Sequence, residues 1–154
     1  MKSFEMRLTQ TTSLGQATDL DGALRDFLGR IGYLQEDEHS EESVAYRLVR
    51  DLFLLGAGTA WSVDELLSKL KTTKPTLYRH LNRLKGLGIL EEVPLDETKD
   101  GARKGYRLRS GNLSRAWDLV EANAGIALKS YREEVDSIQA LVRAEAVLSK
   151  RLTP

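Results

Sequence analysis

Apolar residues recur every three or four positions along most of the chain, which is the spacing of one face of an α-helix. Three such stretches lie in the first half of the chain and cover residues 18–34, 40–55 and 61–70. We expect Thr18 or Asp19 to cap the first helix and Ser40 to open the second. The third begins with an S-x-x-E capping box formed by Ser62 and Glu65.

The first predicted helix has a clear apolar face but many glycines. The face is formed by Leu20, Leu24, Phe27, Leu28, Ile31 and Leu34. Gly22, Gly29 and Gly32 each weaken the helix by up to about 1 kcal/mol relative to alanine, so packing must hold it. Ahead of it, FEMRLTQT at residues 4–11 alternates weakly and is either a short strand or a flexible arm.

A fourth helix is predicted from the stretch TTKPTLYRHLNRLKGLGIL at residues 72–90. Thr72 or Thr73 caps it, and Pro75 stands in the first turn, where a missing N–H costs nothing. Two glycines end it. The segments ILEEV and GYRLR that follow have the alternation of two strands, and a polar, turn-rich segment joins them as a hairpin.

The last segment predicts one long helix or two. Its apolar residues alternate steps of three and four in a heptad-like seam: Leu113, Trp117, Val120, Ala124, Ala127 or Leu128, Tyr131, Val135, Ile138 and Val142. A helix from Ser114 to Arg151 is about 57 Å long, more than one small domain can cover. We therefore expect a homodimer through this helix, helped by the helix at 20–34. The alternative is a helix that breaks at Gly125 and folds back onto its own domain.

Composition narrows the class of protein. The chain has 154 residues, 41% of them apolar, which is enough for one compact domain or a small domain with an extension. The absence of cysteine excludes disulfides, thiolate metal sites and a cysteine nucleophile. Neither a signal peptide nor a membrane span is visible, which predicts a soluble, cytoplasmic protein.

The predicted fourth helix has two chemically different faces. Leu77, Leu81 and Leu84 form its buried face. The opposite face has no acidic residue and is made of Pro75, Thr76, Tyr78, Arg79, Asn82 and Arg83. Arginine can bond guanine and asparagine can bond adenine in the major groove. The residues suited to bonding phosphates are Thr72, Thr73, Lys74 and Tyr78.

Charge is segregated although the chain has a net charge of zero. Residues 71–109 contain ten basic and five acidic side chains, a local charge of +5, while residues 36–42 are strongly acidic. A surface that faces phosphates requires such segregation.

These elements, in this order, resemble a winged helix-turn-helix of the MarR, ArsR, PadR and GbsR group of transcriptional regulators, over about residues 43–110. The segment GARKGYRL resembles the wing of GbsR and MarR proteins, which often reads G-D-R-K before an aromatic residue. Ala102 stands where the acid is usual, and Asp100 is the candidate to replace it in steadying Arg103. The resemblance implies that Arg103 and Lys104 contact DNA from the wing.

We therefore predict a mainly α fold with a small β-hairpin wing: an N-terminal arm and helix at 1–39, a winged helix-turn-helix at 40–111 and a dimerisation helix at 112–154. The expected function is that of a double-stranded DNA-binding transcriptional regulator, not an enzyme, with no cofactor or metal assigned and no effector identified. The alternative is a winged-helix protein-protein interaction module within a larger nucleic-acid-handling assembly.

Other candidate sites have weaker support. His80 flanks the apolar face of the fourth helix and is interpreted as a packing residue. His39 could bind a metal with Glu36 or Glu42, but no ligand spacing supports it. Trp117 and Tyr131 are interpreted as core or dimer contacts. No P-loop, G-x-G-x-x-G or nucleophile elbow is present.

Overall fold

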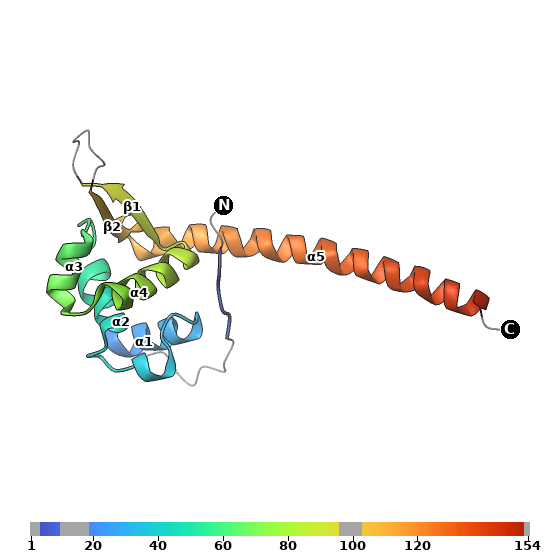
Figure 1. Cartoon of the computed structure of the whole chain (residues 1–154), viewed down its shortest axis with the longest axis horizontal. Helices are drawn as coiled ribbons and strands as arrows, with labels where there is room; N and C mark the ends of the chain where they lie inside the picture. Colours follow the sequence, from blue (N-terminus) through green and yellow to red (C-terminus); the bar gives the residue numbers. More distant parts are fainter. Residues whose placement is uncertain (1–3, 10–18, 96–102, 153–154) are drawn as a thin grey trace. The chain divides into compact units, whose positions relative to one another are not determined.

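The structure is a computed structural model that describes residues 4–9, 19–95 and 103–152. It divides into two compact units, with the division after Val120. The first unit contains the elements α1 (Leu20–Arg30), α2 (Val44–Arg47), α3 (Val63–Leu70), α4 (Lys74–Leu87), β1 (Leu90–Pro94), β2 (Lys104–Leu108) and the start of α5 (Leu113–Leu152) (Figure 1). Short helical turns lie at Glu36–Glu38, Leu48–Leu54 and Arg109–Gly111. The predicted fold, mainly α with a hairpin wing, is confirmed.

The core of the first unit draws on every one of its helices. Leu66 of α3 and Leu77, Leu81 and Leu84 of α4 are fully buried, which confirms the predicted inner face of α4. Ala116 and Val120 of α5 are also fully buried. The helix-turn-helix pair is therefore fixed on a packed support that includes the first turns of α5.

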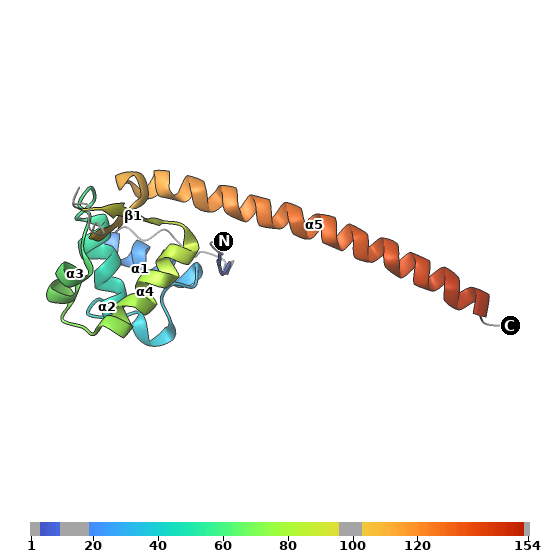
Figure 2. The same cartoon turned by 45° about the horizontal axis from the view of Figure 1, so that its top comes forward.

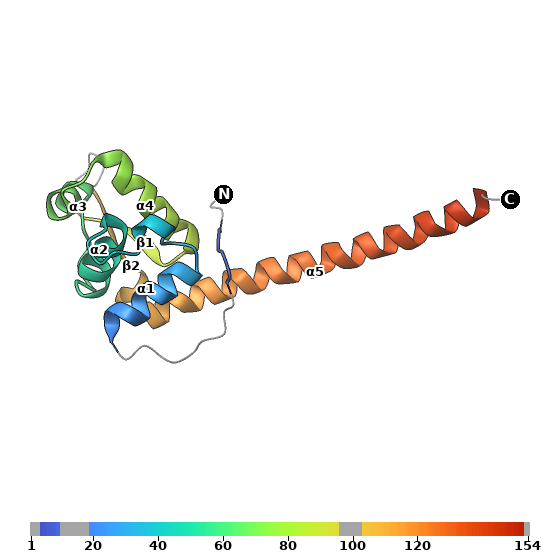
Figure 3. The same ribbon diagram turned by 90° about the horizontal axis from the view of Figure 1, so that it is seen from below.

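The helix α1 is held by its own chain. Leu24 and Leu28 are buried, and the ring of Phe27 meets that of Trp117 edge to face at 5.3 Å, beside the first turns of α5 (Figure 3). Asp19 caps the helix by accepting from the Gly22 N–H. Its own unit already covers most of the apolar face of α1, with Leu20 still 47% exposed, so the expected help of this helix in dimerisation stays a prediction with little apolar surface to support it.

The second helix begins later than predicted. Its N-cap is Ser43, whose Oγ accepts from the Tyr46 N–H at 3.1 Å and donates to the Glu38 carbonyl at 2.7 Å. Ser40 instead accepts from the Glu42 N–H within a turn. A π-helical segment, Leu48–Leu54, continues α2 to the predicted end. The helical turn at 36–38 makes Ser43 the cap, because it brings the Glu38 carbonyl within reach of the Ser43 hydroxyl.

The helix-turn-helix boundaries follow their predicted caps. The Ser62 and Glu65 capping box is present at the start of α3, and Thr73 caps α4. Gly88 ends α4 with a φ of 87°, a conformation that favours glycine. Lys71 ends α3 in the same left-handed region, with a φ of 53°, although it carries a Cβ.

This geometry predicts that Lys71→Gly stabilises the protein by about 0.5–1 kcal/mol, because glycine adopts the left-handed conformation without steric cost. The matched control is Lys69→Gly in the last turn of α3, which we expect to destabilise by about 1 kcal/mol. Urea unfolding of the two variants measures both effects. Equal destabilisation by both substitutions would show that the Lys71 backbone is not strained.

The wing is an antiparallel pair of strands in which Leu90 lies opposite Leu108 and Pro94 opposite Lys104. Trp61 forms an isolated bridge to Tyr106, with both backbone hydrogen bonds made, so a very short extended segment precedes α3. The predicted turn, including Lys99, Asp100 and Ala102, falls outside the described residues. The wing stem is thus tied to the start of α3 through Tyr106.

The N-terminal segment Phe4–Thr9 is not a strand, and its side chains Phe4 and Met6 pack against the core of the first unit. The Glu5 N–H donates to the Gly86 carbonyl at 2.9 Å. Gly32 has a φ of +84°, and a Cβ there would lie 2.7 Å from the Arg7 Cβ. Glycine at this position therefore permits the close approach of the segment.

The helix α5 runs without interruption from Leu113 to Leu152 (Figure 2). It therefore does not break at Gly125, where a Cβ would meet no neighbouring atom. From residue 121 to residue 152, no residue of α5 is buried. The second unit is thus a helix whose apolar seam is largely exposed.

Candidate nucleic-acid interface

The exposed face of α4 carries most of the predicted contacts. Thr73, Lys74, Pro75, Tyr78, Arg79 and Asn82 are exposed, and Thr72 and Thr76 are half-buried. Thr73 Oγ1 lies 3.0 Å from Thr76 Oγ1 and also accepts from the Thr76 N–H. Pro75 has no N–H, so this helix start offers a phosphate fewer backbone donors than an ordinary one. Side chains must therefore supply much of the binding chemistry.

Arg83 does not belong to this exposed face. Its two terminal nitrogens each donate to a carboxylate oxygen of Glu38 at 2.9 Å, and one also donates to the Tyr33 carbonyl. Its guanidinium carbon lies 5.2 Å from the centre of the Tyr33 ring. The side chains of Arg83 and Glu38 are only 23% and 14% exposed. The prediction that Arg83 faces outward is wrong, because its position at the edge of the face brings it against the turn at 36–38.

His80 joins the same cluster. It is 2% exposed, its Nδ1 contacts Arg83 and lies 3.6 Å from Glu38, and its ring packs edge to face on Tyr33. Its interpretation as a packing residue is confirmed. Burial lowers the pKa of His80, with a further contribution from the charge of Arg83. Burial opposes ionisation of Glu38, but hydrogen bonds from Arg83 and the Gln35 N–H outweigh it and lower its pKa.

The hairpin neutralises several more basic residues. Lys85 lies 2.6 Å from Glu92, and Arg107 lies 2.7 Å from Glu91. Arg109 donates to the carbonyls of Gly88 and Leu90. These side chains stabilise the junction between α4 and the wing. Much of the segregated charge that the sequence shows is therefore structural.

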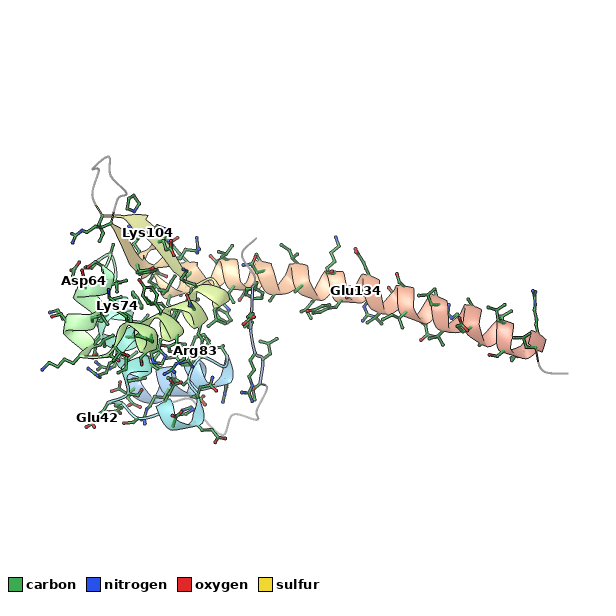
Figure 4. The ribbon with its side chains drawn as sticks, in the orientation of Figure 1. Glu42, Asp64, Lys74, Arg83, Lys104 and Glu134 are labelled. Carbon is green, nitrogen blue, oxygen red and sulfur yellow. The ribbon has the colours of Figure 1, made fainter. Side chains whose placement is uncertain are left out.

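Among the described residues of 71–109, the basic side chains that remain outward lie at two places. Lys71 stands at the turn before α4, Lys74 at the first position of α4 and Arg79 on its exposed face. Arg103 and Lys104 are exposed on the wing stem, and Lys104 is 70% exposed despite a 3.7 Å pair with Glu92. Figure 4 shows Lys74 at the start of α4, Lys104 on the wing and Arg83 on the side of α4 nearer α1. Lys71 is a further candidate contact not predicted above, although its place before the capping threonines is a usable signal.

The described residues give little support for a metal site or a membrane span. Across residues 4–9, 19–95 and 103–152, no group of three or more histidine and carboxylate side chains could hold a metal ion. His39 is exposed and lies over Gly29, where a Cβ would be 2.7 Å from its Cε1. None of the described helices is long and apolar enough to span a membrane.

Comparisons with known proteins give one match. Residues 40–93, which hold α2, α3, α4 and most of β1, match the family described as a helix-turn-helix domain. Searches of curated proteins and of solved structures return no match. The family match supports a DNA-binding regulator of helix-turn-helix type. The resemblance to the MarR, ArsR, PadR and GbsR group in particular stays a prediction.

Proposed function

We propose that the protein is a sequence-specific regulator of transcription that binds double-stranded DNA as a homodimer. The exposed face of α4 enters the major groove, and the basic wing lies on the minor groove or the backbone. One observation carries the proposal: within a helix-turn-helix, α4 presents Lys74, Tyr78, Arg79 and Asn82 outward with no acidic residue among them.

The proposed contacts divide by chemistry. Arg79 and Asn82 read base edges, because their planar groups can each make two hydrogen bonds to one base. The residues that fix the helix on the backbone are Lys71, Thr72, Thr73, Lys74, Thr76 and Tyr78. Arg103 and Lys104 add affinity from the wing, and Arg83 is left out because it pairs with Glu38.

The homodimer is supported by the exposed apolar seam of α5. Tyr131, Val135 and Ile138 are each more than half exposed, and so are Leu141 and Val142. A row of this kind exceeds what a soluble monomer usually leaves in contact with water. A second copy of α5 would cover it, and two-fold symmetry would match two half-sites separated by one helical turn, about 34 Å, or a multiple of it.

An interaction module within a larger assembly is the second candidate. The ion pairs of Lys85, Arg107 and Arg83 with acidic neighbours favour it, because they reduce the charge available to phosphates. The exposed face of α4 argues against it, since its polar and basic groups do not form an apolar docking patch.

We expect Arg79→Ala to cost about 1–3 kcal/mol on a DNA site selected from a random library and to relax base choice at one position. Lys104→Ala should weaken selected and random DNA by similar factors, because a phosphate contact carries no sequence information. Binding titrations on both DNAs measure this, with Lys129→Ala on α5 as the control. If Arg79→Ala weakened both DNAs equally, Arg79 would not read bases.

A further inference from the structure

The seam of α5 has a heptad register that can be assigned residue by residue. With Leu128 at position a, the apolar a and d residues are Leu128, Tyr131, Val135, Ile138, Val142 and Leu152. Each of these six side chains is more than half exposed. Two polar residues, Glu145 at d and Ser149 at a, interrupt the seam near its end. Leu141 and Leu148 stand beside it at position g and are 66% and 52% exposed.

A parallel pair in register would place like residues against each other. Glu145 would face Glu145 of the second copy across the seam, and Ser149 would face Ser149 in the next layer. Two carboxylates forced together in a partly desolvated layer repel each other. Leu141 would meet only a small residue, Ala146, at position e of the second copy. A parallel pair would therefore be poorly stabilised over the last part of the seam.

We propose that two copies of α5 pair antiparallel, with the two-fold axis near Ala140. This rests on the homodimer proposed above and specifies its interface. In an antiparallel pair, each a residue packs against a d residue of the other helix, and this axis gives full overlap of residues 128–152. The resulting layers join Leu128 to the partner's Leu152, Tyr131 to the partner's Ser149, Val135 to the partner's Glu145 and Ile138 to the partner's Val142.

Two features of the sequence fit this register. Position g faces position g in an antiparallel pair, so Leu141 meets the partner's Leu141 at the axis and both are covered. Glu145 comes beside the partner's Arg132, so that its charge has a partner of opposite sign. Within its own helix Arg132 lies 3.9 Å from Asp136, and both side chains are at least 70% exposed. This exposed ion pair is weak, so it hardly opposes the pairing of Arg132 with Glu145 of the other copy.

Spin labels test the orientation directly, because the chain has no cysteine of its own. Single labels are placed through Lys129→Cys, Gln139→Cys and Lys150→Cys, and label-to-label distances are measured by pulsed electron resonance on the full chain. At 1.5 Å of rise per residue, an antiparallel pair separates the two labels at position 129, one on each copy, by about 30 Å or more. The two labels at position 150 are separated by a similar distance, whereas the two labels at position 139 lie close together. A parallel pair gives similar short distances at all three positions and overturns the proposal while leaving the dimer intact. No dipolar coupling at any position, together with a monomer in sedimentation, would overturn the homodimer itself.

A charge exchange tests the register. Glu145→Arg and Arg132→Glu should each weaken dimerisation about 3- to 10-fold, and the double variant should recover most of the loss, because the pair is re-formed with its signs reversed. Glu133→Arg, on the outer face of α5, is the matched control and should change little. If the loss of dimerisation free energy in the double variant equalled the sum of the losses in the two single variants, the proposed register would be overturned.

Discussion

Deleting residues 133–154 is expected to turn a dimer into a monomer and to weaken binding to a two-half-site DNA by about 100-fold or more. In a dimer, once one winged helix is bound to its half-site, the second winged helix binds the other half-site intramolecularly. The monomer loses this second contact. The first unit should remain folded, since its buried residues all precede residue 121. Sedimentation, far-ultraviolet circular dichroism and DNA titration measure the three parts of this prediction.

A double substitution in the full-length chain separates the effect of losing the seam from the effect of shortening the chain. Ile138→Glu with Val142→Glu places two charges in the centre of the seam and should reproduce the truncation. Replacing the outer-face residues Glu133 and Arg143 by alanine is the matched control and should leave the dimer intact. If the full chain sediments as a monomer at micromolar concentration, the dimer and the two-half-site mechanism fail together.

Glu38→Gln is expected to destabilise the protein by about 2 kcal/mol, because it leaves the half-buried guanidinium of Arg83 without its carboxylate. The value is smaller than for a fully buried pair, since Arg83 remains 23% exposed. Glu36→Gln, on an exposed neighbour, is the control and should have little effect. A loss of stability no greater than that of the control would show that the cluster does not fix α4 on the turn at 36–38.

The same cluster predicts a stability that falls in acid. The pKa of Glu38 is lowered in the folded state, so its contribution is complete above its ordinary value of 4.5 and is lost as the pH falls through the lower folded value. The pKa of His80 is also lowered, so below its ordinary value of 6.5 the unfolded chain takes up a proton that the folded chain resists. Unfolding free energies measured from pH 7 to pH 3 should decline in both ranges. In Glu38→Gln the decline near and below pH 4.5 should become shallower.

Local signals predicted most of the fold. The start of α3 is set by the capping box of Ser62 and Glu65, the start of α4 by Thr73 with Pro75, and the end of α4 by Gly88. Each of these signals lies within a few residues of the helix end that it sets. The apolar spacing of α4 gave its buried face correctly. Ser43 was missed as a cap because the decisive partner, the Glu38 carbonyl, depends on a turn that the sequence pattern does not show.

The candidate site could be predicted only in part. Thr73, Lys74, Tyr78, Arg79 and Asn82 lie outward, as their places on the helix indicate. Charge counting overestimated the phosphate-facing surface, because ion pairs between distant segments cannot be seen in a sum of charges. The pair of Arg83 and Glu38 joins residues 45 positions apart, a contact that only the fold reveals.

The central claim is that the outward face of α4 and the wing bind the phosphate backbone and bases of duplex DNA. A titration of the full chain with duplex DNA over a range of salt concentrations tests it most directly. With about six to ten phosphate contacts per dimer, the logarithm of the binding constant should fall against the logarithm of salt concentration with a slope of about −5 to −9. A flat response, or no binding at low salt, would contradict the DNA-binding account and favour an interaction module.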